Sequence, residues 1–256
     1  MIPYFSLISF ELGPLKIYSW GLLASLGILI GLLIALQRAG KRLDAEKILN
    51  LSLLIIFLSF IGARLFYVFF GGVGDYFWAN PWRFFFFWEG GLASTGGFLG
   101  AGLALLIFYR QNKKTFWPYA ENLAFAFPFG WLVARLGCFL IHDHPGQLTN
   151  LFLAVNFPLG RRLDMGLMEA FCIFPLLLFF LFLGQKEKKD GFYSARLLLW
   201  YGVMRFFLDF WRAADLPGSD PRFWSLTAAQ WGSAIIFFLG LTIYYKKIKR
   251  KGAGAV

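Results

Sequence analysis

Seven hydrophobic runs divide the chain, and each is long enough to cross the apolar core of a bilayer as a helix of about 20 residues. A backbone in hydrocarbon must satisfy its own N–H and C=O groups, so runs of this length predict helices. Only 15% of the residues are charged, against about 25% in an ordinary soluble domain. The sequence therefore predicts an all-α polytopic membrane protein with seven transmembrane helices, forming a single transmembrane domain over residues 1–256. The expected spans are Ile17–Gln37, Ile48–Phe70, Gly91–Tyr109, Pro118–Ile141, Leu167–Leu183, Phe192–Trp211 and Thr227–Tyr245.

Basic residues are distributed unevenly between these runs. Fifteen fall on one side and six on the other, while four lie within spans. Because cytoplasmic segments are enriched in Lys and Arg, this places the N-terminus outside and the C-terminus in the cytoplasm. We therefore expect a short ordered segment, residues 1–16, on the outer surface and a basic cytoplasmic tail, residues 246–256. The net charge of +11 is scattered over several short segments, which favours contact with anionic membrane lipid and argues against a nucleic-acid partner.

Three arginines interrupt the hydrophobic runs at a similar expected depth. At a rise of about 1.5 Å per residue, Arg64, Arg135 and Arg205 each lie roughly 20 to 25 Å along their spans from the cytoplasmic end. Asp209 follows Arg205 by one helical turn, so the two can pair. A charge in hydrocarbon is costly without a partner, so one interpretation is that a carboxylate or backbone carbonyl neutralises each arginine. The interpretation that we favour is a site for the phosphate of a phospholipid head group.

The only two histidines of the chain follow the span that carries Arg135, in the segment His142-Asp143-His144-Pro145-Gly146. Histidine titrates near neutral pH and is well suited to proton transfer. Metal binding by three adjacent residues is disfavoured, because neighbouring side chains diverge and no further ligands are evident in the sequence. We therefore expect neither a metal nor another cofactor, and we treat His142, Asp143 and His144 as candidate catalytic residues.

A glycine-rich stretch opens the third span and reads Gly90-Gly91-Leu92-Ala93-Ser94-Thr95-Gly96-Gly97. One interpretation is that small residues at this spacing let two helices approach closely. The other is that they leave room for a bulky substrate beside Ser94 and Thr95, with the backbone amides of a helix N-terminus facing an anion. Glu89 stands just before this turn.

Several short motifs occur in order along most of the chain. They are Ser19-Trp20-Gly21-Leu22, Gly62-Ala63-Arg64-Leu65-Phe66-Tyr67, Trp88-Glu89 followed by the glycine-rich stretch, Ala134-Arg135-Leu136-Gly137-Cys138-Phe139 closing at Asp143 and Gly146, and Tyr201-Gly202-Val203-Met204-Arg205-Phe206 followed by Asp209-Phe210-Trp211-Arg212. Each motif alone is moderate evidence, but together and in this order they resemble the prolipoprotein diacylglyceryl transferase family.

The resemblance implies a multi-pass enzyme of the bacterial cytoplasmic (inner) membrane with its active site towards the outer leaflet. Such an enzyme transfers the diacylglyceryl group from phosphatidylglycerol to the lipobox cysteine thiol of preprolipoproteins, the first step of lipoprotein maturation. Its partners are phosphatidylglycerol and the signal peptides that carry the lipobox cysteine. By position, Arg135 and Arg205 match the essential arginines, and Asp143 stands where the family has glutamate. The other matched positions, expected to bind substrate, are Trp20, Arg64, Glu89, Ser94, Thr95, Gly96, Gly97, Cys138, Gly146, Tyr201 and Asp209.

Three matched positions depart from the family pattern: Thr95 replaces a histidine, Cys138 an asparagine and Trp20 a tyrosine. Because threonine does not titrate near neutral pH, the family's base has no direct equivalent here. We hypothesise that His142 or His144 takes that role. The alternative is that both histidines only cap the end of the span. The fifth-span motif also differs and reads Leu163-Asp164-Met165-Gly166-Leu167-Met168-Glu169.

Two other functions stay open. One is a divergent homologue that uses a different acceptor or has lost catalysis, and the missing histidine is its main support. The other is a small-solute or lipid transporter, which is expected to place its site nearer the bilayer midplane than these polar groups lie.

Overall fold

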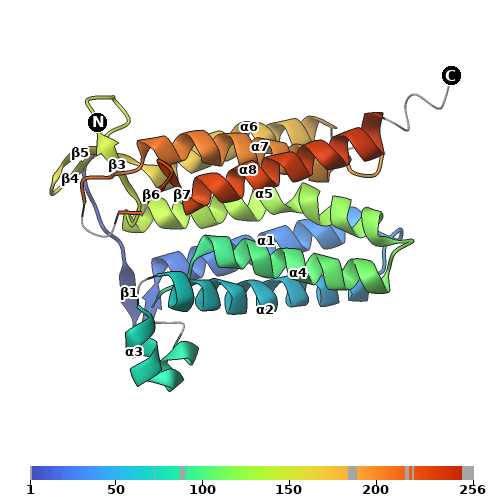
Figure 1. Cartoon of the computed structure of the whole chain (residues 1–256), viewed down its shortest axis with the longest axis horizontal. Helices are drawn as coiled ribbons and strands as arrows, with labels where there is room; N and C mark the ends of the chain where they lie inside the picture. The colour runs from blue at the N-terminus through green and yellow to red at the C-terminus, as the bar shows by residue number, and fades with distance from the viewer. Residues whose placement is uncertain are drawn as a thin grey trace. The chain divides into compact units, whose positions relative to one another are not determined.

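The computed structural model describes residues 2–71, 73–86, 90–183, 189–216, 219–220 and 222–249. Within them the chain is mostly helical, and a helix overlaps each of the expected spans (Figure 1). The long helices are α1 (Ser19–Ala39), α2 (Ala45–Phe70), α4 (Ser94–Gln111), α5 (Phe116–Ile141), α6 (Met165–Leu183), α7 (Phe192–Leu208) and α8 (Ala228–Ile243). Shorter helical segments are α3 (Gly74–Ala79), η1 (Pro81–Phe85), η3 (Asp209–Trp211) and η4 (Tyr244–Lys249).

Five helical segments of the described residues are long and apolar enough to cross a membrane. They are Ser19–Ala39, Ala45–Phe70, Phe116–Ile141, Met165–Leu183 and Ala228–Ile248. Helix α7 is shorter, with 17 residues. Helix α4 has 18 residues, but its glycines and its polar first and last turns lower its hydropathy. The chain is therefore a multi-pass membrane protein by length and composition, and the count of seven spans stays a prediction.

Three small antiparallel sheets accompany the helices in the described residues, so the fold is mostly helical and not all-α. The strands have only two to five residues, too few for an alternating pattern to predict them. The first sheet pairs β1 (Ser9–Leu12) with β2 (Leu15–Tyr18), within the N-terminal segment that was expected to be ordered. The others are β3 (Pro145–Leu148), β5 (Gly160–Asp164) and β4 (Val155–Phe157) in that order, and β6 (Arg222–Phe223) with β7 (Leu226–Thr227).

The chain forms two compact units, Met1–Arg38 with Glu121–Val256, and Ala39–Ala120. The expectation of a single domain over residues 1–256 stays a prediction. In the second unit, α2 and α4 pack through glycines. A side chain at Gly96 would collide with the backbone of Gly62, and one at Gly100 with the backbone of Leu58. The two helices thus approach backbone to backbone, as small residues permit in membrane proteins.

The first unit has a buried apolar cluster that joins α5, β5, α6 and α7. Its members are Trp131, Leu163, Met165, Ile173, Met204 and Leu208. The β3–β5 sheet and the β6–β7 hairpin lie at the end of this unit where α5 and α7 terminate (Figure 1). An isolated backbone bridge pairs Gly146 of β3 with Arg212, which directly follows η3.

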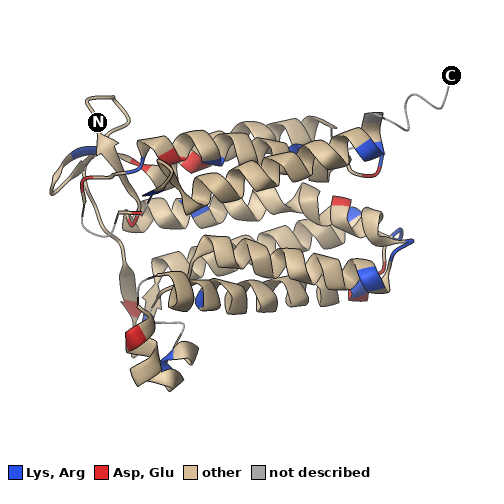
Figure 2. Ribbon diagram, viewed as in Figure 1, with Lys and Arg blue, Asp and Glu red and all other residues tan. Residues whose placement is uncertain are grey.

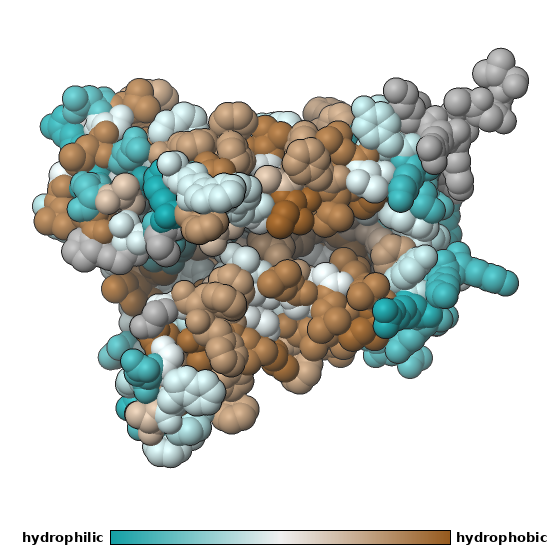
Figure 3. All heavy atoms as spheres, in the orientation of Figure 1, coloured by the Kyte–Doolittle hydropathy of each residue, from teal (hydrophilic) through white to brown (hydrophobic). Residues whose placement is uncertain are grey.

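Apolar side chains cover the flanks of the helices in each unit, and hydrophilic residues gather at the helix ends (Figure 3). Acidic and basic residues also lie together on α7, close to the strands (Figure 2). Burying a charge within an apolar segment costs free energy, and such charges are usually functional. This end of α7 is therefore the candidate site.

Candidate active site

A single buried carboxylate joins the two arginines that the sequence singled out in the first unit. Glu169, on the first turns of α6, has only 1% of its side chain exposed. Its Oε2 lies 2.7 Å from Nε of Arg135, and its Oε1 accepts a hydrogen bond of 2.5 Å from Nη1 of Arg205. Arg135 keeps 22% of its side chain exposed, whereas Arg205 keeps 8%. Helices α5, α6 and α7 therefore bring two cations to one anion.

Arg205 is also paired along its own helix, as the i, i+4 spacing predicted. Its Nη2 lies 3.1 Å from Oδ1 of the fully buried Asp209. The other oxygen of Asp209 accepts a hydrogen bond from the hydroxyl of Thr227. Thr227 is the N-cap of α8 and forms a capping box with Gln230, and Gln230 in turn donates to the carbonyl of Phe206. The start of α8 thus holds Asp209 in position.

Tyr201, Trp20 and Cys138 surround this network. The hydroxyl of Tyr201 lies within electrostatic range of Arg135, Arg205 and Glu169, and its ring packs 5.3 Å from that of Trp131. Nη1 of Arg135 donates to the sulfur of Cys138 at 3.6 Å, and Trp20 forms a second hydrogen bond to the same sulfur. Positions predicted from three separate motifs therefore meet in one place: Trp20, Arg135 with Cys138, and Tyr201 with Arg205.

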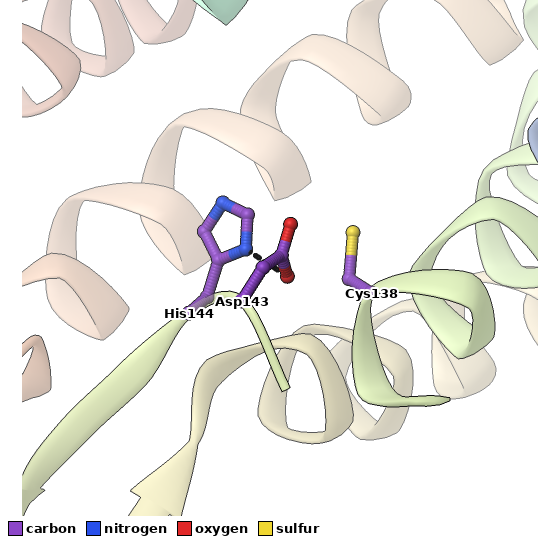
Figure 4. A group of neighbouring side chains, drawn as sticks. All are labelled: Cys138, Asp143 and His144. Carbon is purple, nitrogen blue, oxygen red and sulfur yellow. Dashed lines mark hydrogen bonds and ion pairs between the residues drawn. The ribbon is translucent and has the colours of Figure 1, made fainter. Parts of the chain in front are cut away.

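Asp143 and His144 lie on the open side of the same site. They follow α5 directly, are hydrogen-bonded through Oδ1 and Nδ1, and each keeps about a third of its side chain exposed. Figure 4 shows the carboxylate of Asp143 between the imidazole of His144 and the thiol of Cys138. His144 is also within electrostatic range of Glu169. Of the two histidines, His144 is the one that adjoins the arginine network.

His142 occupies a different environment. Its side chain is fully buried, its Nδ1 donates to Oδ2 of Asp164 at 2.7 Å, and the rings of Tyr4, Phe5, Phe139 and Phe157 pack around it. Burial raises the pKa of Asp164, and the hydrogen bonds from His142 and from the N–H of Leu167 oppose that rise. His142 has a backbone φ of 52°, and its N–H bonds the carbonyl of Cys138 at the end of α5. The capping interpretation therefore fits His142, and a role in proton transfer to a substrate does not.

Gly146 on β3 and Arg162 on β5 contact each other next to the site. A side chain at Gly146 would meet Leu163 and the carbonyl of Trp211 at 2.9 Å, so glycine is required for packing there rather than for substrate contact. The buried Arg162 donates to the carbonyl of Gly146 and grips the carboxylate of Asp215 with both terminal nitrogens. This guanidinium lowers the pKa of Asp215 below its ordinary value.

Arg64 lies in the second unit, where backbone carbonyls engage it. Its side chain donates to the carbonyls of Arg83, Phe84, Phe86, Gly90 and Gly91, and the residue is only 1% exposed. Five carbonyl partners satisfy a guanidinium and hold the loop before α4 in place. The expectation that Arg64 contacts substrate is therefore not supported, and neutralisation by carbonyls is the interpretation that its geometry favours.

The glycine-rich stretch also divides into two kinds of residue. Gly96 is buried against α2, where only a glycine fits, while Gly97 has ordinary space around it. Ser94 is exposed at the first turn of α4 and Thr95 is half-buried behind it. Glu89 lies outside the described residues.

Sequence reasoning missed three residues that organise the site: Glu169, Asp164 and Thr227. Glu169 had a usable signal, because a lone carboxylate in an apolar span is a functional candidate by default. Thr227 also had one, since a threonine followed three residues later by glutamine predicts a capping box. Asp164 had no signal in the sequence, because its role depends on the position of β5, which places its carboxylate against His142.

The family profile described as prolipoprotein diacylglyceryl transferase matches residues 7–246. A phosphatidylglycerol–prolipoprotein diacylglyceryl transferase of Pasteurella multocida is 32% identical over 83% of this chain and 81% of its own length. Similar proteins of the same name from Mannheimia succiniciproducens and Francisella tularensis subsp. holarctica are 31% and 29% identical, over 83% and 94% of this chain and 82% and 92% of their own lengths. The chain therefore belongs to the prolipoprotein diacylglyceryl transferase family.

Proposed function

We propose that this chain transfers the diacylglyceryl group of phosphatidylglycerol to the thiol of the lipobox cysteine in a preprolipoprotein and releases glycerol phosphate. The observation that carries the proposal is the joining of Arg135 and Arg205 by the buried carboxylate of Glu169. Two guanidinium groups held side by side, one of them partly exposed, suit the phosphate of a phospholipid. Membership of the family supports the substrate class.

The reaction is an alkyl transfer at carbon. The sulfur of the acceptor forms a C–S bond while the C–O bond to phosphate breaks, and the electron pair leaves on the phosphate oxygen. Stabilising this developing charge is the main electrostatic demand. Arg135 is exposed enough to contact the phosphate, and Arg205 adds its charge from a buried position between Glu169 and Asp209.

An apolar groove along α6 and α7 is suited to an acyl chain of the donor. It has a volume of about 740 Å³, and its lining includes Pro175, Leu176, Phe179, Leu199, Val203 and Phe207. The same two helices carry Glu169 and Arg205. A lipid whose phosphate lies at the arginines can therefore place a chain beside the helices that position its head group.

The acceptor thiol must lose its proton, because a free cysteine has a pKa of about 8.5 and the thiolate is the nucleophile. Thr95 cannot act as a base. Asp143 and His144 are the groups placed to promote this step, since both lie partly exposed beside Cys138, and His144 is also within electrostatic range of Glu169. His142 is committed to its buried pair with Asp164.

We further propose seven spans, with the N-terminus outside, the C-terminus in the cytoplasm and the site towards the outer leaflet of the inner membrane. The uneven distribution of basic residues supports this orientation. Arg135 and Arg205 lie in the last two turns of α5 and α7, at the ends expected to reach the outer leaflet. Helix α7, with 17 residues, is at the lower limit of about 17 for a spanning helix.

The test is modification of a preprolipoprotein by the purified full chain in vesicles that contain phosphatidylglycerol. Mass spectrometry is expected to find a diacylglyceryl group on the lipobox cysteine. Arg135→Lys should lower the rate of product formation by about 100-fold, while Arg161→Lys, an exposed position on β5, should leave it unchanged. Consumption of phosphatidylglycerol without this product would favour a different acceptor. Failure to consume it, together with failure to complement a transferase-deficient strain, would contradict the proposed function.

A further inference from the structure

Cys138, Asp143 and His144 form a cluster that the sequence alone does not indicate. Their candidate ligand atoms, a thiol sulfur, a carboxylate oxygen and an imidazole nitrogen, all lie within 4.8 Å of one another (Figure 4). The adjacent set His142-Asp143-His144 was disfavoured as a metal site because its side chains diverge. In the fold His142 does turn inward, and Cys138, from the last turn of α5, approaches the other two residues instead.

The chemistry of this cluster fits zinc. Thiolate, imidazole and carboxylate are the ligands that Zn²⁺ accepts, and a site with three protein ligands keeps a fourth position open. Ligand atoms of a tetrahedral zinc ion lie about 3.4 to 3.6 Å apart. To reach that geometry from the present spacing, the side chains of Asp143 and His144 have to rotate, and both are partly exposed.

Two hydrogen-bond donors also face the sulfur of Cys138. Arg135 and Trp20 both donate hydrogen bonds to its sulfur, and donors of this kind stabilise a metal-bound thiolate. The charge balance is favourable as well. One thiolate and one carboxylate neutralise a divalent cation, so the loaded cluster adds no net positive charge beside Arg135.

We propose that Cys138, Asp143 and His144 bind a zinc ion whose fourth position takes up the acceptor thiol as its thiolate. The inference rests on the proposed function for the identity of the acceptor. It accounts for Thr95, because a metal that deprotonates a coordinated thiol removes the need for a histidine base. A direct nucleophilic role for Cys138 is disfavoured, since a thioether on its own sulfur does not react further.

In the loaded site the incoming thiol gives its proton to a zinc-bound hydroxide, which leaves as water. The thiolate then occupies the fourth position. Its sulfur attacks the glyceryl carbon of the donor, the C–O bond breaks, and the electron pair leaves on the phosphate beside Arg135. The thioether product binds zinc more weakly than the thiolate and dissociates. Water then returns to the ion and releases a proton to solvent, which restores the hydroxide.

Metal binding is tested on the purified full chain in detergent, with Zn²⁺ and Co²⁺ as the probes. We expect about one zinc per chain and, with Co²⁺, a sulfur-to-metal charge-transfer band. The band should disappear in Cys138→Ser and persist in Cys172→Ser, which changes the other free cysteine, outside the cluster. Asp143→Asn and His144→Gln should each weaken Co²⁺ binding by at least about 10-fold. A wild-type chain that gives no thiolate band, or a band that survives in Cys138→Ser, overturns the inference.

Activity separates this inference from the proposed function. Removal of metal by a chelator should abolish diacylglyceryl transfer, and added Zn²⁺ should restore it. Transfer that continues in metal-free protein overturns the zinc role while the proposed function stands. A third outcome is also informative: the chain binds metal through Cys138 but transfers nothing to the lipobox cysteine. That result would confirm the metal site, and it would overturn both the transferase function and the role of zinc in it.

Discussion

Glu169 and Arg205 meet at 2.5 Å, and almost no surface of either side chain is open to solvent. The second oxygen of Glu169 is paired with Arg135 at 2.7 Å, so one carboxylate fixes both arginines. A charge left buried without its partner is strongly destabilising, by about 3 to 5 kcal/mol. Glu169 therefore fixes the positions of the two arginines that form the proposed anion site.

Replacement of Glu169 by glutamine keeps the shape of the side chain and removes its charge. We expect Glu169→Gln to lower the free energy of unfolding by about 3 kcal/mol, because Arg205 loses a buried partner. Transferase activity should fall with it. Thermal unfolding in detergent and a diacylglyceryl transfer assay measure the two effects. Glu46→Gln, at an exposed position near the start of α2, is the control and should change neither. Wild-type stability in Glu169→Gln would contradict the assignment.

Lysine at either arginine keeps the positive charge and loses the planar fork. We expect Arg135→Lys and Arg205→Lys each to lower kcat/KM by about 100-fold, because a single donor to the leaving oxygen contributes effects of this size. Steady-state kinetics with phosphatidylglycerol as the varied substrate measure the loss. Arg161→Lys lies outside the site and should retain wild-type kinetics. Full activity in Arg135→Lys would remove that residue from the phosphate site.

The two histidines should behave in opposite ways when each is replaced by alanine. His142→Ala leaves Asp164 buried without its partner, so the free energy of unfolding should fall by about 3 kcal/mol. Activity per folded molecule should be retained. His144→Ala, at a partly exposed position, should retain stability and lose transfer activity. If His142→Ala instead lost activity without losing stability, and His144→Ala kept its activity, His142 would be the base.

The pair of Arg162 and Asp215 predicts a pH effect in the segment that follows η3. Arg162 holds the pKa of Asp215 below its ordinary value of 3.8. A lowered carboxyl pKa stabilises the fold above the ordinary value, and the contribution is lost as the pH falls through the folded value. Hydrogen exchange of residues 213–216, corrected for intrinsic rates, should therefore lose protection between about pH 5 and pH 2. Asp215→Asn should show low protection throughout, and Asp220→Asn, which faces Arg212 instead, should retain the transition.

Gly96 and Gly97 give a matched test of the glycine-rich stretch. Gly96→Ala forces a methyl group into the backbone of Gly62 and should cost about 2 kcal/mol of stability. Gly97→Ala meets only ordinary contacts and should leave stability unchanged or raise it by up to about 1 kcal/mol. Thermal unfolding measures both variants. Loss of activity in a stable Gly97→Ala would instead support the interpretation that this glycine leaves room for substrate.

Hydrophobic runs predicted the helices well because a spanning helix satisfies its hydrogen bonds within itself. The expected span Leu167–Leu183 and helix α6, Met165–Leu183, even end at the same residue. Site residues on these helices could be predicted in the same way. Arg135 and Arg205 were evident as charges in apolar runs, and the i, i+4 pairing of Arg205 with Asp209 followed from helical spacing alone.

Interaction partners that loops supply to these side chains could not be predicted from the hydropathy pattern. Arg64 is satisfied by the carbonyls of Arg83, Phe84, Phe86, Gly90 and Gly91, and hydropathy does not indicate which carbonyls reach a buried guanidinium. The different roles of His142 and His144 depend on one backbone angle. The positive φ of His142 turns its side chain into the aromatic cluster and leaves His144 beside Cys138.

The hydrogen bond from Thr227 to Asp209 has a consequence for the biogenesis of the protein. Thr227 is the N-cap of α8, whereas Arg205 lies on α7 and Asp209 begins η3, so the ribosome makes both of them before α8. The network cannot close until α8 has been synthesised and inserted. A nascent chain that still lacks this helix therefore has an incomplete network around Arg205 and Asp209.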